Sequence, residues 1–247
     1  MKKIWEITLS FGILLAIWQG IVAIGNFSPA LLPSPWAVGE ALFELFANGV
    51  MIKNILVSLY RFAMGYSIAV AFGAILGLVL GWYPKLFGYT NPILQYLRPI
   101  APVAWMPFVV LLIGIGDTPA IVIIFLAAFF PVVLTTANAV RKLDPIYLKI
   151  AANYGVKEPE VLWKIVFPAV FPQVANSLHL ALGSAWVFLV PAEMIGAQSG
   201  LGYMIVDARN NMRTDQLLSA MVVIGIIGLL LDLSIARGEK TVMKLWE

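Results

Sequence analysis

The sequence predicts an all-α integral membrane protein with about six transmembrane helices. Of its 247 residues, 61% are hydrophobic and only 12% are charged, and mean hydropathy is +0.92. Soluble domains carry about 25% charged residues. A chain this apolar cannot cover a water-facing surface with polar groups, so we expect lipid to be its solvent.

The apolar stretches are long enough to cross a bilayer. A helix needs about 20 apolar residues to span the roughly 30 Å hydrocarbon core. The first stretch carries Glu6 and has no small-residue cleavage site, so we interpret it as a retained span. The third contains Pro99, Pro102 and Pro107, which predicts a bent segment buried among other helices. Within a single transmembrane domain over 1–247, we expect spans near 4–24, 58–81, 98–115, 118–139, 173–194 and 216–236.

Lys and Arg residues indicate the orientation of these spans. With the N-terminus inside, the inner segments hold twelve of the 16 Lys and Arg residues and the outer segments hold four. Positive charge concentrates on the cytoplasmic side of membrane proteins. We therefore predict a multi-pass protein with both termini in the cytoplasm.

Several kinds of chemistry are excluded by composition. The chain has no Cys and one His, which argues against thiolate catalysis, disulfides and metal clusters built on these residues. No Gly-x-x-x-x-Gly-Lys-Ser/Thr phosphate loop is present. We expect no catalytic residue, no metal site and no nucleic-acid partner.

Small residues recur at every fourth position of the second span. The residues are Gly65, Ala69, Gly73, Gly77 and Gly81. Such a stripe lets another helix approach closely. We predict a packing face, and the alternative is that the stripe lines a passage through the membrane.

The outer connection over 25–57 contains an amphipathic segment. Ser34 and Pro35 are suited to the N-cap and first position of a helix. The apolar residues between Trp36 and Phe46 then predict a helix that lies on the outer surface.

The inner connection over 144–168 predicts two short helices with a sharp corner between them. Asp144 is suited to an N-cap, Gly155 to a left-handed C-cap, and Pro159 to the start of a second helix that runs toward Pro168. One face carries Tyr147, Ile150, Ala151 and Tyr154. An apolar face centred on Ala151 and Ala152 would fit a groove in a cytoplasmic partner. The alternative is an amphipathic linker on the inner leaflet.

This connection resembles the EAA signature of bacterial ABC importer permeases. That pattern is Glu-Ala-Ala, three residues, Gly, nine residues and Ile-x-Leu-Pro. Aligned on Gly155, the chain matches with Ala151, Ile165 and Pro168 and has Phe167 at the Leu position. It departs from the pattern at the first two positions, which hold Lys149 and Ile150.

Further motifs are similar to the nitrate/sulfonate/taurine/bicarbonate branch of these permeases. They include Leu32-Pro33-Ser34-Pro35, Leu97-Arg98-Pro99-Ile100, Gly114-Ile115-Gly116-Asp117 and Ser199-Gly200-Leu201-Gly202-Tyr203. The resemblance covers nearly the whole chain. It implies a type I importer permease with a cytoplasmic coupling helix between spans 4 and 5, in a bacterial or archaeal cytoplasmic membrane.

The resemblance also implies partners. Two permease copies would pair in the lipid bilayer as a homodimer, two ATP-binding cassette ATPase subunits would dock below, and an extracytoplasmic solute-binding protein would deliver the solute. ATP-Mg would bind to the ATPase, and no cofactor would bind to this chain. Within the coupling segment over 141–170, the expected ATPase-coupling residues are Lys149, Ile150, Ala151, Ala152, Tyr154, Gly155, Glu158, Ile165 and Pro168.

Two other groups of residues are candidates for the solute. Ionisable residues inside a membrane are costly and often functional. The candidates for the solute path are Trp105, Met106, His179 and Glu193, although each could be a packing or anchoring residue. Contacts with the binding protein are expected from Trp36, Arg209 and Arg213, whose arginines could instead bind lipid phosphate.

The sequence leaves the solute open. The resemblance implies a small anion or zwitterion such as nitrate, a sulfonate, taurine or bicarbonate, and the alternative within the same class is a vitamin precursor. An ion-coupled secondary transporter is a further alternative. It is disfavoured because spans 1 to 5 carry no carboxylate at mid-depth.

Overall fold

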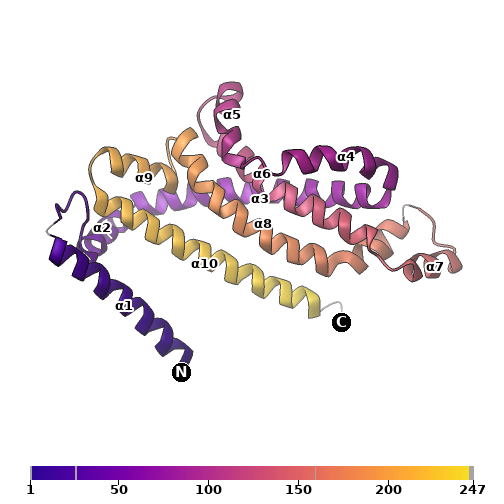
Figure 1. The fold of residues 1–247 in the computed structure, drawn as a ribbon, viewed down its shortest axis with the longest axis horizontal. Coiled ribbons are helices and arrows are strands. Elements are labelled where there is room, and N and C mark those ends of the chain that lie inside the picture. Colours follow the sequence, from indigo (N-terminus) through magenta and orange to yellow (C-terminus); the bar gives the residue numbers. More distant parts are fainter. Residues whose placement is uncertain (1, 26, 159, 245–247) are drawn as a thin grey trace. The chain divides into compact units, whose positions relative to one another are not determined.

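The computed structural model describes residues 2–25, 27–158 and 160–244, and these form helices joined by short connections (Figure 1). The chain divides into two compact units. One comprises Met1–Ser58 with Ser199–Ile226, and the other comprises Leu59–Gln198 with Ile227–Glu247. The all-α class predicted from the sequence is confirmed, whereas the single domain over 1–247 stays a prediction.

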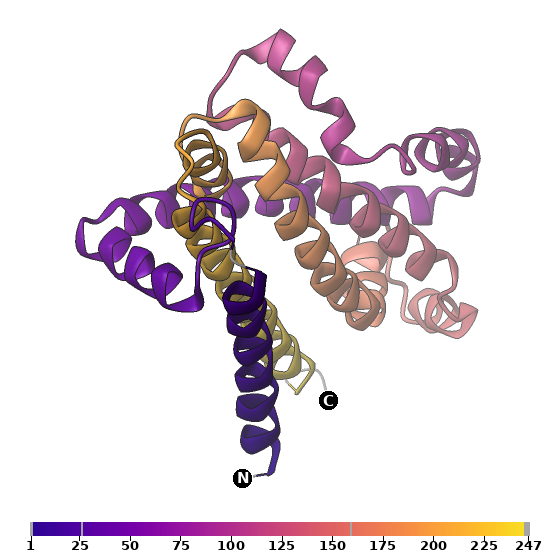
Figure 2. The same cartoon turned by 60° about the vertical axis from the view of Figure 1, so that its left-hand side comes forward.

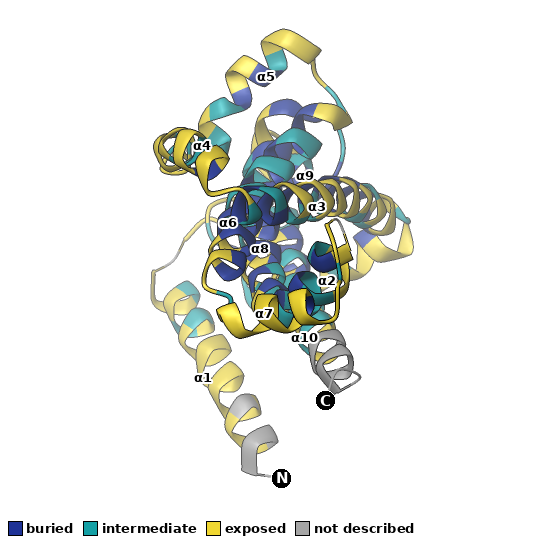
Figure 3. Ribbon diagram, turned by 90° about the vertical axis from the view of Figure 1, so that its right-hand side faces the viewer, coloured by how far each residue is buried: buried dark blue, intermediate teal, exposed yellow. Residues whose placement is uncertain are grey.

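The first unit contains the N-terminal helices and the segment after residue 198. It holds α1 (Lys2–Gly25), α2 (Pro35–Ala47), α9 (Leu201–Asn210) and the first parts of α3 and α10. Helix α2 begins as expected, because the Ser34 side chain accepts a hydrogen bond from the amide of Ala37 at 3.2 Å. Figure 3 shows that the described side chains of α1 are mostly exposed, as expected of a helix that faces lipid or another chain.

The second unit contains most of the apolar helices. It holds the main part of α3 (Val50–Trp82), α4 (Pro84–Leu97), η1 (Pro102–Trp105), α5 (Met106–Ile113), α6 (Asp117–Arg141), α7 (Pro145–Asn153), η2 (Leu162–Val166), α8 (Phe167–Gly196) and the last part of α10 (Thr214–Lys244). Helices α6 and α8 pack along each other through their length, as Figures 1 and 2 both show. The core of this unit is the buried face of α6.

The small-residue stripe of α3 packs against α6. A methyl group added at Gly65 would lie 2.8 Å from the carbonyl oxygen of Ile121. A methyl group at Gly77 would lie 2.6 Å from Cβ of Thr136, and one at Gly81 would lie 2.5 Å from Cβ of Val140. Real Cβ atoms do not come this close to their neighbours. The stripe is therefore the packing face predicted from its spacing.

Among the described residues, five helices are long and apolar enough to cross a membrane, or six segments if one bent pair is a single span. The bent pair is Pro84–Leu97 with Pro102–Ile113, and its two parts meet at 86°. Residues 98–115 are therefore not one continuous span. The segment is buried on one side of α5 only, because Met106 and Val109 are buried whereas Phe108, Leu111 and Leu112 are exposed.

Arg98 lies at the break in this bent pair, between α4 and η1. Its expected place in an inner connection stays a prediction. Pro99 and Pro102, which lie at the break, explain it. Each proline lacks an amide donor, and each disfavours a helical conformation at the preceding residue.

The inner connection differs from the expected pair of short helices. The first is present as α7, but the second does not end at Pro168. Residues 160 and 161 are helical, η2 is a π-helical turn, and the chain continues without interruption into α8. Pro168 closely follows the π-helical turn, and it contributes no amide hydrogen to this continuous helix. Pro159, the expected start of the second helix, lies outside the described residues.

Candidate functional site

The α7 segment has the local geometry that its capping residues predict. The Asp144 side chain accepts a hydrogen bond from the amide of Ile146 at 2.9 Å and so caps the first turn. At the other end, Gly155 has φ +67°, and the amide of Val156 donates to the carbonyl of Ala151 at 3.0 Å. This is the left-handed C-cap expected of glycine. Local hydrogen bonds therefore fix the start of α7, the turn at Gly155 and the direction of the chain after that turn.

The buried face of α7 is the one that carries Ala151. Ala151 is 2% exposed and belongs to a cluster with Leu78 of α3, Val140 of α6 and Val170 of α8. Of the two alanines at the centre of the expected docking face, Ala152 is exposed, whereas Ala151 packs inside its own chain. A residue this small is suited to that position because it lets α7 approach the ends of three longer helices closely.

The exposed face of α7 carries larger apolar side chains. Tyr147, Ile150 and Tyr154 lie at helical spacing and are all exposed, Tyr154 by 83%. Lys149 and Ala152 are exposed as well. We call the surface formed by Tyr147, Ile150 and Tyr154 the α7 outer face. Single exposed apolar residues are common, but three on one short helix form a surface suited to a partner.

The remaining expected coupling residues contact their own chain. The Glu158 carboxylate accepts a hydrogen bond from the indole Nε1 of Trp82, at the end of α3, at 2.7 Å. Ile165 is partly buried against the cluster that contains Ala151, and Pro168 is half-buried. Glu158 also lines a pocket of about 610 Å³ with Trp82, Arg141 and Leu148. These residues hold the α7 segment to the ends of α3 and α6.

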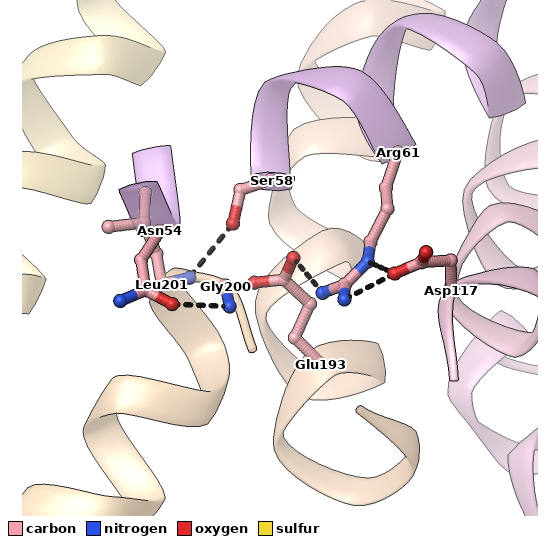
Figure 4. A network of polar contacts seen from close by, with 7 residues as sticks. All are labelled: Asn54, Ser58, Arg61, Asp117, Glu193, Gly200 and Leu201. Atoms are coloured by element: carbon pink, nitrogen blue, oxygen red, sulfur yellow. Dashed lines mark hydrogen bonds and ion pairs between the residues drawn. The ribbon is translucent and has the colours of Figure 1, made fainter. Parts of the chain in front are cut away.

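A buried ion cluster joins α3, α6 and α8. Arg61 on α3 donates through Nη1 to the Glu193 carboxylate at 2.7 Å, and through Nε and Nη2 to one oxygen of Asp117 at 2.8 and 2.6 Å (Figure 4). Arg61 is 1% exposed and Glu193 is 0% exposed, whereas the Asp117 side chain is 57% exposed. Of these two carboxylates, Glu193 is buried with the guanidinium, whereas water can reach Asp117.

The Arg61 cluster was only partly predicted from the sequence. Glu193 is proposed as a residue of the solute path, but its carboxylate is held by Arg61. The pairing could have been recognised from the spacing of α3, since Arg61 lies four residues before Gly65 and so continues the stripe that faces α6. A charged residue on a packing face needs a partner on the opposing helices.

The other candidates for the solute path occupy different environments. Met106 is fully buried in a core cluster with Val109, Ile123 and Ala192, and Trp105 packs against the same cluster. His179 on α8 is half-buried, and its Nε2 lies 3.0 Å from the Asp232 carboxylate on α10. Met106 and Trp105 are therefore packing residues in this conformation, and the structure does not bring the four candidates together.

The candidates for outer contacts belong to the first unit. Trp36 is 76% exposed, although its indole donates to Glu40 at 2.7 Å. Arg213 lies 3.0 Å from Asp215 and 3.7 Å from Glu44. The hydrogen bond that the Arg213 guanidinium donates to the Asp215 carboxylate is the main cause that raises the pKa of Arg213 above its ordinary value. Arg209 is exposed and is within 3.5 Å of the Asn210 side chain.

The segment that leads into α9 is held by two polar side chains of α3. Asn54 accepts a hydrogen bond from the amide of Gly200 at 2.7 Å, and Ser58 accepts one from the amide of Leu201 at 2.8 Å (Figure 4). Free amides at the start of a helix need such acceptors. Gly200 has φ +99°, a conformation that glycine adopts readily. This pair of bonds was not predicted from the sequence.

The chain is similar to curated permeases over most of its length. It is 33% identical over 238 residues to the taurine transport system permease protein TauC of Escherichia coli (strain K12), covering 93% of this chain and 86% of that protein. It is 32% identical over 232 residues to the putative aliphatic sulfonates transport permease protein SsuC of Bacillus subtilis (strain 168), covering 94% and 84%. It is 32% identical over 250 residues to the nitrate import permease protein NrtB of a Synechocystis species, covering 98% and 90%.

A solved structure and a family profile agree with these relatives. The fold is similar to that of a chain in the MetNI methionine ABC transporter, crystallised in an inward-facing conformation. The TM-score is 0.69 at 17% identity, over 78% of this chain and 96% of that one. The profile of binding-protein-dependent transport system inner membrane components matches residues 69–238. This match spans well over half of the chain, which therefore belongs to the family of binding-protein-dependent transport system inner membrane components, the permeases of ABC importers.

Proposed function

We propose that this permease pairs with a second copy of itself and imports a small anionic or zwitterionic solute that an external binding protein delivers. Separate ATPase subunits hydrolyse ATP and act on the permease through residues 144–168. Relatives named as taurine, aliphatic sulfonate and nitrate permeases support this solute class.

One observation carries the coupling part of this proposal. The α7 outer face presents Tyr147, Ile150 and Tyr154, while Ala151 on the opposite side packs against the ends of α3, α6 and α8. A push on the exposed side would therefore act directly on three apolar helices. Packed interiors transmit displacement because they are dense and deform little.

The coupling surface is tested by charge substitution on α7. Tyr154→Glu is expected to abolish co-purification of the ATPase and ATP-driven uptake in vesicles, because a carboxylate would have to be desolvated at the contact. Lys85→Glu, an exposed change at the start of α4, is the matched control and is expected to retain both. Retention of both ATPase co-purification and uptake by Tyr154→Glu would exclude the α7 outer face as the contact with the ATPase.

The proposed orientation is tested by labelling single cysteines in a chain that has none of its own. A cysteine that replaces Lys157 is expected to react only from the cytoplasmic side, and one that replaces Gln198 only from outside. Both positions are exposed. The reverse labelling pattern would refute both the orientation and the position of the ATPase contact.

A further inference from the structure

A second pocket lies at the break between α4 and η1, away from the α7 segment. It has a volume of about 260 Å³, and its walls are Arg98 and Ile100 at the break, Phe130 and Pro131 on α6, and Phe188 on α8. The 86° bend of the chain opens the space that these side chains surround. We call it the Arg98 pocket.

The Arg98 pocket lies near the middle of an apolar helix. Helix α6 has 25 residues, enough at about 1.5 Å per residue to cross the roughly 30 Å hydrocarbon core. Phe130 and Pro131 lie close to its midpoint. In secondary transporters, discontinuous helices at this depth commonly form the solute site.

The wall formed by α6 and α8 is tied together beside the pocket. Pro131 has no amide hydrogen, so the carbonyl of Ala127 loses its helical donor. The Ser184 hydroxyl on α8 lies 3.3 Å from that carbonyl oxygen and can donate to it, although it also lies near two carbonyls of its own helix. Neighbouring side chains commonly satisfy such freed groups in membrane helices. The wall of the pocket that carries Phe130 and Phe188 is therefore held in place.

Arg98 supplies the charge of the pocket. Its side chain makes no hydrogen bond or ion pair with any other residue that the structure describes, and none of the lining residues carries a carboxylate. A guanidinium carries five donors and stays protonated. Arg98 is exposed at the mouth of the pocket. At the middle depth of a bilayer, a guanidinium is costly unless an anion neutralises it or it faces a water-filled path. This distinguishes Arg98 from Arg61, whose charge Glu193 and Asp117 already balance.

We propose that the Arg98 pocket binds the solute on its way through the membrane, and that the solute is a small organic monoanion of the sulfonate type. The inference rests on the proposed importer function. Arg98 would bind the charged group, and Phe130 and Phe188 would contact the apolar part.

The lining residues favour one of the solute classes for which the relatives are named. A zwitterion such as taurine would leave its ammonium group without a carboxylate among the lining residues, and nitrate has no apolar part to fill the aromatic side. The volume equals that of about nine water molecules at roughly 30 Å³ each. It is also below the roughly 300–1,000 Å³ typical of pockets for drug-sized ligands, which favours a small aliphatic solute over a vitamin precursor.

The test measures binding of radiolabelled butanesulfonate to the purified permease–ATPase complex by equilibrium dialysis, without the binding protein. Taurine and nitrate are expected to compete at least tenfold less well than unlabelled butanesulfonate. Arg98→Gln is expected to weaken binding roughly tenfold or more, as for loss of a charge-assisted hydrogen bond. Lys85→Gln, an exposed change at the start of the preceding helix α4, is the matched control and is expected to leave binding unchanged.

A second variant distinguishes a role of the pocket in solute binding from an effect of Arg98→Gln on folding. Phe130→Ala would enlarge the apolar side and is expected to shift the preference from butanesulfonate toward hexanesulfonate. Unchanged binding in Arg98→Gln, an unchanged chain-length preference in Phe130→Ala, or equal competition by nitrate would overturn the proposal. Failure of the intact importer, with its binding protein, to take up any anion in an ATP-dependent manner would instead refute the proposed function.

Discussion

The Arg61 cluster gives the most quantitative test of the structure. Replacing Arg61 with Met would remove the buried positive charge and leave the Glu193 carboxylate, which is 0% exposed, without that partner. Breaking a buried ion pair from one side typically costs about 3–5 kcal/mol, because the remaining charge is uncompensated in a medium of low polarity. We expect Arg61→Met to lower the free energy of unfolding by an amount in this range.

The matched changes separate charge pairing from packing. Asp117→Asn removes the second carboxylate, but this side chain is 57% exposed, so water can replace the lost interaction. Its cost should be about 0–1 kcal/mol, as for surface pairs. The double variant Arg61→Met with Glu193→Leu removes both buried charges together. It should be considerably more stable than the sum of the two single changes predicts.

The assay is thermal unfolding of the purified permease in detergent, followed by the fluorescence of its eight tryptophans. The quantity of interest is the coupling between the Arg61 and Glu193 changes in a double-mutant cycle. If the two changes add without coupling, or if Asp117→Asn costs as much as Arg61→Met, the assigned pairing is wrong.

The features that the sequence predicted well are those set by local spacing. The small-residue stripe from Gly65 to Gly81 has one possible face at 3.6 residues per turn, and the structure places that face on α6. The caps at Ser34, Asp144 and Gly155 were likewise predictable, because each cap bonds to residues within one turn. Local rules suffice where the partner is close in sequence.

The features that the sequence missed depend on long-range packing. The face of α7 that carries Ala151 was expected to be free, since helical periodicity groups apolar residues without indicating what covers them. Ala151 is instead covered by Leu78, Val140 and Val170, which come from three different helices. The helix α4 (Pro84–Leu97) lies before the expected span over 98–115 and was not predicted, whereas the prolines after Arg98 predicted a bend.

Three further changes test the packing of the second unit around α3, α6 and α7. Gly77→Ala is expected to destabilise the protein by about 1–3 kcal/mol because the new methyl group would overlap α6. Gly88→Ala, with open space around it, should be near neutral. An equal effect of the two changes on thermal unfolding would contradict the α3–α6 contact. Gly155→Val should cost about 1–2 kcal/mol, since φ +67° is unfavourable for a side chain with a Cβ atom, and an unchanged unfolding midpoint would contradict the left-handed cap. Ala151→Glu distinguishes packing from docking. Because Ala151 is 2% exposed, a carboxylate there would have to be buried or displace α7 from its cluster, so we expect the isolated permease itself to lose stability. Tyr154→Glu on the exposed face should leave that stability within about 0.5 kcal/mol. If Ala151→Glu left the isolated permease as stable as Tyr154→Glu does and lost only the ATPase, Ala151 would lie in the partner contact and the packing of α7 described above would be incorrect.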